Sequence, residues 1–122
     1  MGEGDLELEQ LFHNHFKCEH ITRTCEKCQH TQGKMEYTLY TLPRVLVLHL
    51  NRITFTAQGD TTKKQNNVSI PLQLSLQCVS GRKRYRLASF ITHLGSAATR
   101  GHFICDVRAP DNTWCSCDDS VI

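Results

Sequence analysis

The chain has 122 residues, enough for one small domain, and 39% of them are hydrophobic, which allows a modest core. Its net charge of +2 (14 lysines and arginines against 12 aspartates and glutamates) lacks the strongly basic balance of nucleic-acid-binding proteins. No apolar run reaches the length of a membrane span, and the acidic start MGEGDLELEQ has no signal-peptide core. We therefore expect neither a nucleic-acid nor a membrane partner.

The N-terminal third predicts a helix followed by a polar, cysteine-bearing segment. Residues 5–16 place apolar side chains at helical spacing, and Asp5 is suited to cap the helix. Residues 17–33 are polar and carry three cysteines and two histidines. The alternating stretch KMEYTLYT at 34–41 predicts a β-strand.

The middle of the chain predicts two strands separated by a polar loop. VLVLHL at 45–50 is apolar at nearly every position, which is typical of a central strand covered on both faces. Residues 57–67 are polar and predict a loop. A second strand is expected at 68–76, where Pro71 favours an edge or a bulge.

The C-terminal third predicts antiparallel strands joined by turns. GRKR at 81–84 is expected to form a hairpin turn before a strand at 85–94. A loop of small residues at 95–101 precedes strands at 102–107 and 114–117. The whole pattern indicates an α+β, β-rich fold, mainly antiparallel, with one N-terminal helix.

His102 is the first residue of the strand expected after the small-residue loop. The hairpin formed by this strand and the next one is expected to bring Asp118 and Asp119 close to His102. A carboxylate beside an imidazole fixes its tautomer and stabilises its protonated form, as a general base requires. The alternative is a structural histidine–aspartate pair. The small residues of the loop, Gly95, Ser96 and Gly101 among them, allow close approach of an extended peptide, or simply form a hairpin loop.

Seven cysteines without an export signal argue for a reducing, intracellular compartment, the cytoplasm and/or nucleus. Cys25 and Cys28 form a Cys-x-x-Cys knuckle, which supplies two of the four ligands of a structural zinc site. Cys18 and His20 are candidate partners. Alternatively, the knuckle only marks a turn between two strands.

Five segments taken in order resemble the C-terminal half of a ubiquitin-specific protease catalytic domain. They are LPRVLVLHLNRI (42–53), VSIPLQL (68–74), YRLASFITHLG (85–95), GHFICDV (101–107) and WCSCDDSV (114–121). TCEKC at 24–28 is similar to a knuckle of that family's zinc ribbon. The resemblance implies that residues 1–122 are a single partial domain of papain-like cysteine protease fold. In it, 5–16 is a helix, 17–41 a remnant of the zinc-ribbon fingers, and 42–122 the palm strands.

The resemblance also implies roles for individual residues. His102 matches the catalytic histidine, Asp118 the acid that orients it, and Asp119 an acid that supports the site. The loop 95–101, including Gly95, Ser96 and Gly101, matches the loop that folds over the ubiquitin C-terminal tail. Phe103 takes the place of a tyrosine beside that tail and keeps its apolar wall.

The family's nucleophile box, Gly-x-x-Asn-x-Gly-Asn-Thr-Cys, is missing, and none of the seven cysteines has the setting of a nucleophile. We therefore expect a truncated or spliced C-terminal part of a thiol-dependent deubiquitinase, inactive alone. The parent would hydrolyse the (iso)peptide bond after the ubiquitin C-terminal glycine. Its partner would be ubiquitin or a ubiquitinated protein, with no cofactor for catalysis and a candidate structural zinc.

Two other functions remain open at this point. One is a catalytically inactive ubiquitin-binding or scaffold fragment, and the other is a small zinc-ribbon interaction module. Strands that lose their neighbours leave open sheet edges, so self-association is also expected.

Overall fold

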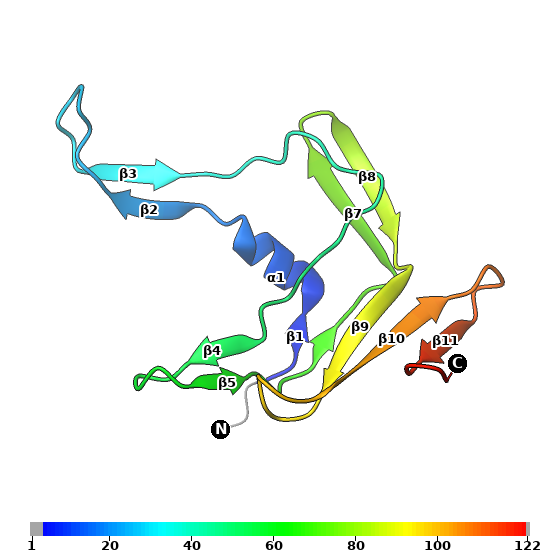
Figure 1. Cartoon of the computed structure of the whole chain (residues 1–122). Helices are drawn as coiled ribbons and strands as arrows, with labels where there is room; N and C mark the ends of the chain where they lie inside the picture. The colour runs from blue at the N-terminus through cyan, green and yellow to red at the C-terminus, as the bar shows by residue number, and fades with distance from the viewer. Residues whose placement is uncertain (1–3, 122) are drawn as a thin grey trace.

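The computed structural model describes residues 4–121 and contains one short helix and a set of short strands (Figure 1). The elements in chain order are β1 (Leu6–Glu7), α1 (Leu8–His15), β2 (Glu19–Thr22), β3 (Gln32–Met35), β4 (Ile53–Phe55), β5 (Thr61–Lys63), β6 (Val68–Ser69), β7 (Gln73–Cys78), β8 (Gly81–Arg86), β9 (Ser89–Leu94), β10 (His102–Arg108) and β11 (Trp114–Cys117). Apart from the parallel pair β1–β6, all strand pairs are antiparallel. The β-rich fold with one N-terminal helix is therefore confirmed.

The helix α1 begins later than expected, because the residues before it form a strand. The Leu6 N–H donates to the Asn67 carbonyl oxygen at 2.8 Å, and β1 pairs with β6. Glu7 occupies the N-cap position and makes no side-chain capping bond. The expected cap at Asp5 is therefore wrong, although the centre of the predicted helix is confirmed.

The strands β2 and β3 form a hairpin that projects away from the other elements (Figure 1). Pairing runs from Glu19↔Met35 to Thr22↔Gln32, so Cys25 and Cys28 lie in the loop at the tip. The strand expected at 34–41 ends at Met35, and residues 36–41 continue without strand pairing.

The apolar segment 45–50 is not a strand, which corrects the expectation of a central strand covered on both faces. Val45 is 75% exposed and Val47 83% exposed, because no strand within residues 4–121 pairs with this segment. A strand exists only through hydrogen bonds to a neighbour, whatever its apolar content. Of Val45, Leu46 and Val47, only Leu46 packs against the core.

The core lies on one face of the β7–β8 hairpin, where the alternation of QLSLQC buries every second side chain. Its buried members are Leu42, Leu74, Leu76 and Cys78. The hairpin turn falls at 79–80, and GRKR lies inside β8, so the turn expected at 81–84 is displaced by two residues. The predicted strand 85–94 is divided between β8 and β9.

The last three strands form one antiparallel sheet in the order β11–β10–β9. The loop at 95–101 and the strands that follow it lie where the sequence predicts them. The interruption predicted at Pro71 is also confirmed, since it separates β6 from β7. This three-stranded sheet positions the candidate site.

Candidate active site

The hairpin β10–β11 brings His102 and Asp118 together. His102 is the first residue of β10, and Asp118 directly follows β11, which pairs with β10 from Cys105↔Cys117 to Arg108↔Trp114. The His102 imidazole is hydrogen-bonded through Nε2 to the Asp118 carboxylate Oδ1. Because this bond engages Nε2, Nδ1 is the other ring nitrogen, and within residues 4–121 it has no hydrogen-bond partner.

The electrostatics of this pair favour a protonated imidazole. The hydrogen bond to Asp118 and the negative charge of that carboxylate raise the pKa of His102 above its ordinary value. The charge of Asp119 contributes in the same direction, whereas desolvation opposes it. The side chains of His102 and Asp118 are 45% and 52% exposed, so a proton donor or acceptor can reach the ring.

Asp119 lies in a tight turn that fixes the end of the hairpin. Asp118 and Val121 exchange two backbone hydrogen bonds, of 2.8 and 2.9 Å, around Asp119 and Ser120. Asp119 has φ of 52°, a left-handed conformation that aspartate tolerates better than most residues. Its carboxylate, that of Asp118 and the His102 ring have ligand atoms within 4.8 Å of one another.

The loop 95–101 is held in place by side chains from the β4–β5 region. The Lys63 ammonium donates to the carbonyl oxygens of His93 at 2.7 Å and Gly95 at 2.6 Å. Gln65 donates to the Ser96 carbonyl oxygen at 3.3 Å. These contacts could not be predicted from the sequence, because the composition of residues 57–67 indicates only a polar loop.

Gly101 is required by close packing at the start of β10. A Cβ atom there would lie 2.3 Å from His93 Nε2 and 2.3 Å from the Leu94 carbonyl oxygen. The chain itself therefore occupies the space that this glycine leaves. Phe103 is 65% exposed and lies 4.8 Å from the His93 ring, on the sheet face opposite to His102 because strand side chains alternate.

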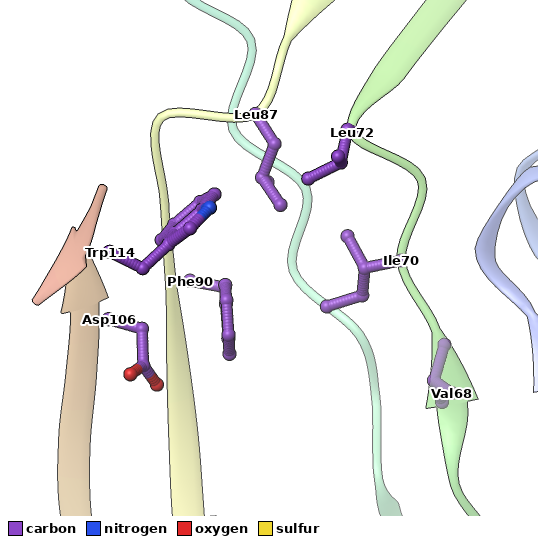
Figure 2. Close-up of a pocket in the computed structure, with 7 residues that line it drawn as sticks. All are labelled: Val68, Ile70, Leu72, Leu87, Phe90, Asp106 and Trp114. Carbon is purple, nitrogen blue, oxygen red and sulfur yellow. The ribbon is translucent and has the colours of Figure 1, made fainter. Parts of the chain in front are cut away.

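An apolar cavity of about 410 Å³ opens beside the same sheet (Figure 2). Figure 2 shows side chains from two parts of the chain pointing into it, namely Val68, Ile70, Leu72, Leu87, Phe90, Asp106 and Trp114. Asp106 shares a face of β10 with His102, four residues away along the strand. This cavity could not be predicted from the sequence, because its lining residues belong to separate predicted elements.

Cys25 and Cys28 lie in a tight turn that the Gln29 N–H closes by donating to the Cys25 carbonyl oxygen at 2.8 Å. Backbone hydrogen bonds from Cys28 and Lys27 to the sulfur lower the pKa of the Cys25 thiol, which suits a thiolate ligand. Within residues 4–121, the only convergent group of three or more His, Cys, Asp and Glu side chains is His102, Asp118 and Asp119. Cys18 and His20 belong to no such group within residues 4–121.

Comparisons with known proteins identify the family. The sequence model of the ubiquitin carboxyl-terminal hydrolase family matches residues 3–122. The chain is 36% identical over 90 residues to ubiquitin hydrolase B of Dictyostelium discoideum, covering 70% of this chain and 20% of that protein. It is 32% identical over 103 residues to ubiquitin carboxyl-terminal hydrolase 10 of Saccharomyces cerevisiae, covering 80% of this chain and 13% of that protein. The chain thus spans a fifth or less of these relatives.

Solved structures agree in fold. The SAGA Ubp8/Sgf11/Sus1/Sgf73 DUB module bound to ubiquitin aldehyde contains a chain that matches 98% of this one, with a TM-score of 0.82 and 23% identity. The match covers 31% of that chain. No helix within residues 4–121 is long and apolar enough to cross a membrane. From the family match and the relatives, this chain belongs to the ubiquitin carboxyl-terminal hydrolase family and is part of a ubiquitin-specific protease domain.

Proposed function

We propose that this chain supplies the general base and its orienting acid to a cysteine-type deubiquitinase. The parent enzyme hydrolyses the peptide or isopeptide bond that follows the C-terminal glycine of ubiquitin. The observation that carries the proposal is the hydrogen bond between His102 Nε2 and Asp118, which leaves Nδ1 for a thiol. Family membership supports the reaction class.

His102 acts first as a base. Its Nδ1 takes the proton of the nucleophilic thiol, and the resulting imidazolium is stabilised by the Asp118 carboxylate. The contact that raises the pKa of His102 therefore favours the ion pair of thiolate and imidazolium. Asp119 adds negative charge near the same ring.

His102 then acts as an acid. The thiolate attacks the glycine carbonyl carbon, and the tetrahedral intermediate collapses when His102 gives its proton to the leaving lysine amine. Water, deprotonated by the neutral His102, hydrolyses the remaining thioester and restores the thiol. The loop 95–101 lies at the entrance to β10, where Gly95 and Ser96 are exposed and available to an extended ubiquitin tail.

We propose further that the nucleophilic thiol comes from outside these 122 residues. Within residues 4–121, no cysteine sulfur joins the convergent group around His102. Loss of the nucleophile from a catalytic unit lowers the rate by ~10⁴-fold or more. The chain alone is therefore expected to be inactive on ubiquitin carrying a C-terminal fluorophore.

The proposed role of His102 is tested by supplying the nucleophilic thiol on a second polypeptide. The chain is mixed with a nucleophile-bearing N-terminal half of a family catalytic domain, and fluorophore release from ubiquitin is measured. Activity is expected with the wild-type chain and not with His102→Ala. His13→Ala, which changes an exposed histidine on α1, is the matched control and should behave as wild type. Equal rates for wild type and His102→Ala would refute the proposal.

A second candidate function is ubiquitin binding without turnover. It is favoured by the same absence of a convergent cysteine within residues 4–121. Under this function, ubiquitin binds the chain alone, which titration calorimetry measures, and the complemented mixture releases no fluorophore. Release that depends on His102 excludes it.

We propose Cys25 and Cys28 as two ligands of a structural zinc whose other ligands lie outside the described residues. The lowered pKa of Cys25 supports this assignment. Metal analysis of the complemented protein should find zinc that is lost in Cys25→Ser. Retention of zinc by Cys25→Ser would refute the assignment.

A further inference from the structure

Three free thiols of the β10–β11 hairpin have no part in the proposed hydrolysis. They are Cys105, Cys115 and Cys117. Cys105 is the direct cross-strand partner of Cys117, and Cys115 is the partner of Val107. Because cross-strand partners share a face and side chains alternate along a strand, all three thiols lie on one face of the sheet. His102 lies on the other face.

The register selects one pair of these thiols for a disulfide. The Ala109 N–H donates to the Thr113 carbonyl oxygen at 2.7 Å, so Ala109 and Thr113 form a hydrogen-bonded pair. Hydrogen-bonded and non-hydrogen-bonded pairs alternate along an antiparallel ladder. Cys105↔Cys117, four residues away along β10, is therefore also a hydrogen-bonded pair. Such a pair has Cα atoms about 5.5 Å apart, which is within the usual range of about 4.4–6.8 Å for disulfides. Its Cβ atoms lie toward the wide end of about 4.5–5.5 Å, beyond the usual range of about 3.5–4.5 Å, so a bridge requires the two strands to draw together at this pair. The diagonal pair Cys105 and Cys115 is about 7–8 Å apart, too far for a bridge. Cys115 and Cys117 lie about 6.6 Å apart along one strand, at the limit of the range.

The thiol face is accessible to a small oxidant. Cys105 and Cys117 are half-buried, and their neighbours on that face, Ile91 and Phe103, are 70% and 65% exposed. β11 is an edge strand of this sheet. A small disulfide made of two linked tripeptides, oxidised glutathione, can therefore approach Cys117 from the open side.

We propose that Cys105 and Cys117 form a reversible cross-strand disulfide when the chain meets a low-molecular-weight disulfide oxidant. One thiolate attacks the oxidant, forms a mixed disulfide and releases one glutathione thiolate. The second thiolate then attacks the protein sulfur of that mixed disulfide and releases the second glutathione. The two thiol protons pass to the two glutathiones, so the oxidant is reduced by two electrons as the protein is oxidised.

This disulfide adjoins the His102–Asp118 contact. Cys117 is the residue immediately before Asp118, and Cys105 lies three residues beyond His102 on β10. A bridge must draw the two sulfurs into bonding distance, and the backbone bearing Asp118 moves with Cys117. We expect oxidation to change the environment of the His102 ring, although the ring and the bridge lie on opposite faces.

Peptide mapping tests the site directly. The folded, reduced chain is treated with oxidised glutathione, remaining thiols are alkylated, and the protein is cut with trypsin after Arg100 and Arg108. Peptide 101–108 contains only Cys105, and peptide 109–122 contains the other two thiols. A cross-link between these peptides is expected, and dithiothreitol should remove it.

Two variants identify the partner thiol. Cys115→Ser should retain the cross-link, whereas Cys117→Ser should reduce it to background, and fragmentation of the wild-type cross-linked peptide should place the bridge on Cys117. The monomer band of a non-reducing gel is the material analysed. A bridge between Cys115 and Cys117, a stable mixed disulfide, or a cross-link confined to dimers would overturn the proposal.

The coupling to His102 has its own measurement. The chemical shifts of the His102 ring, followed by NMR against pH, should differ between the reduced and oxidised Cys115→Ser chain, and identical titrations would overturn the coupling. Neither experiment uses ubiquitin or hydrolysis. Failure of the disulfide is therefore distinguishable from failure of the proposed enzymatic function.

Discussion

His102 and Asp118 form the contact on which the proposed chemistry depends, and it is open to measurement in the chain alone. Asp118→Asn removes the negative charge but keeps the side-chain shape. We expect the pKa of His102 to fall toward its ordinary value, because the hydrogen bond to Asp118 and its charge are the main causes of the raised pKa. An NMR titration of the imidazole measures this change. Asp60→Asn, an exposed change in another hairpin, should leave the titration unchanged.

The same pair predicts a pH dependence of stability. The pKa of His102 is raised in the folded chain, so its protonated form stabilises the fold. This contribution is complete below the unfolded pKa, about 6.5, and is lost as the pH rises through the folded value. The difference in unfolding free energy between wild type and Asp118→Asn should therefore shrink as the pH is raised above about 6.5. Urea unfolding over a pH series checks this, and a difference that grows instead would contradict it.

Gly101 gives a residue-scale prediction about packing. In Gly101→Ala, the new methyl group would lie 2.3 Å from both His93 Nε2 and the Leu94 carbonyl oxygen. One of these neighbours is backbone, so we expect a loss of about 1–3 kcal/mol in unfolding free energy, typical of overpacking. Urea denaturation measures the loss. Gly4→Ala, whose Cβ meets nothing within 4 Å, should change stability by less than about 0.5 kcal/mol.

Single residues differ in how far the sequence could predict them. The contact between His102 and Asp118 could be predicted from the sequence, because a hairpin of ordinary length connects the two residues. Gly101 was singled out correctly as a site of close approach, but the group that approaches it is the chain itself. Lys63 could not have been found, because its two acceptors are backbone carbonyls some thirty residues away. Backbone carbonyls leave no mark in a sequence.

At the scale of elements, Lys63 links the β4–β5 hairpin to the loop 95–101. Lys63→Met removes two charge-assisted hydrogen bonds, of 2.7 and 2.6 Å, while keeping the length of the side chain. Hydrogen bonds to a charged group contribute about 1.5–3 kcal/mol, and less where they are exposed, as the bond to Gly95 is. We expect amide hydrogen exchange in the loop to accelerate about tenfold or more, as measured by mass spectrometry of peptides that span it.

Neighbouring side chains provide the controls for the loop. Lys64→Met makes the same chemical change one residue later and should leave exchange in the loop unaltered. Gln65→Ala removes one neutral bond of 3.3 Å and should have a smaller effect than Lys63→Met. If Lys63→Met and Lys64→Met exchange at the same rate, the loop is not held by Lys63.

Elements with local signals were predicted well, and elements that depend on distant partners were not. The alternation in β7, the break at Pro71 and the β10–β11 hairpin follow from residues close in sequence. The start of α1 was misplaced because β1 pairs with β6, sixty residues away. The segment 45–50 was assigned as a strand from composition, yet strand pairing needs a neighbour that residues 4–121 do not provide.

At the scale of the whole molecule, the buried core is small for the apolar content. The buried hydrophobic residues within 4–121 are Leu8, Leu42, Leu74, Leu76 and Cys78, whereas Val45, Val47, Phe55 and Ile91 are each at least 70% exposed. The chain also spans only part of the related proteins. We infer that its apolar surface is complementary to further parts of a family domain.

Exposed apolar surface of this extent predicts self-association of the isolated chain. Size-exclusion chromatography with light scattering should find a mass that increases with concentration. The double substitution Val45→Lys/Val47→Lys places charge on the most exposed apolar segment and should shift the chain toward monomer. Gln58→Lys/Thr61→Lys adds the same charge at exposed polar positions and separates the effect of apolar surface from that of net charge. A concentration-independent monomer mass for the wild-type chain would mean that this apolar surface does not drive association, whatever it contacts in a larger protein.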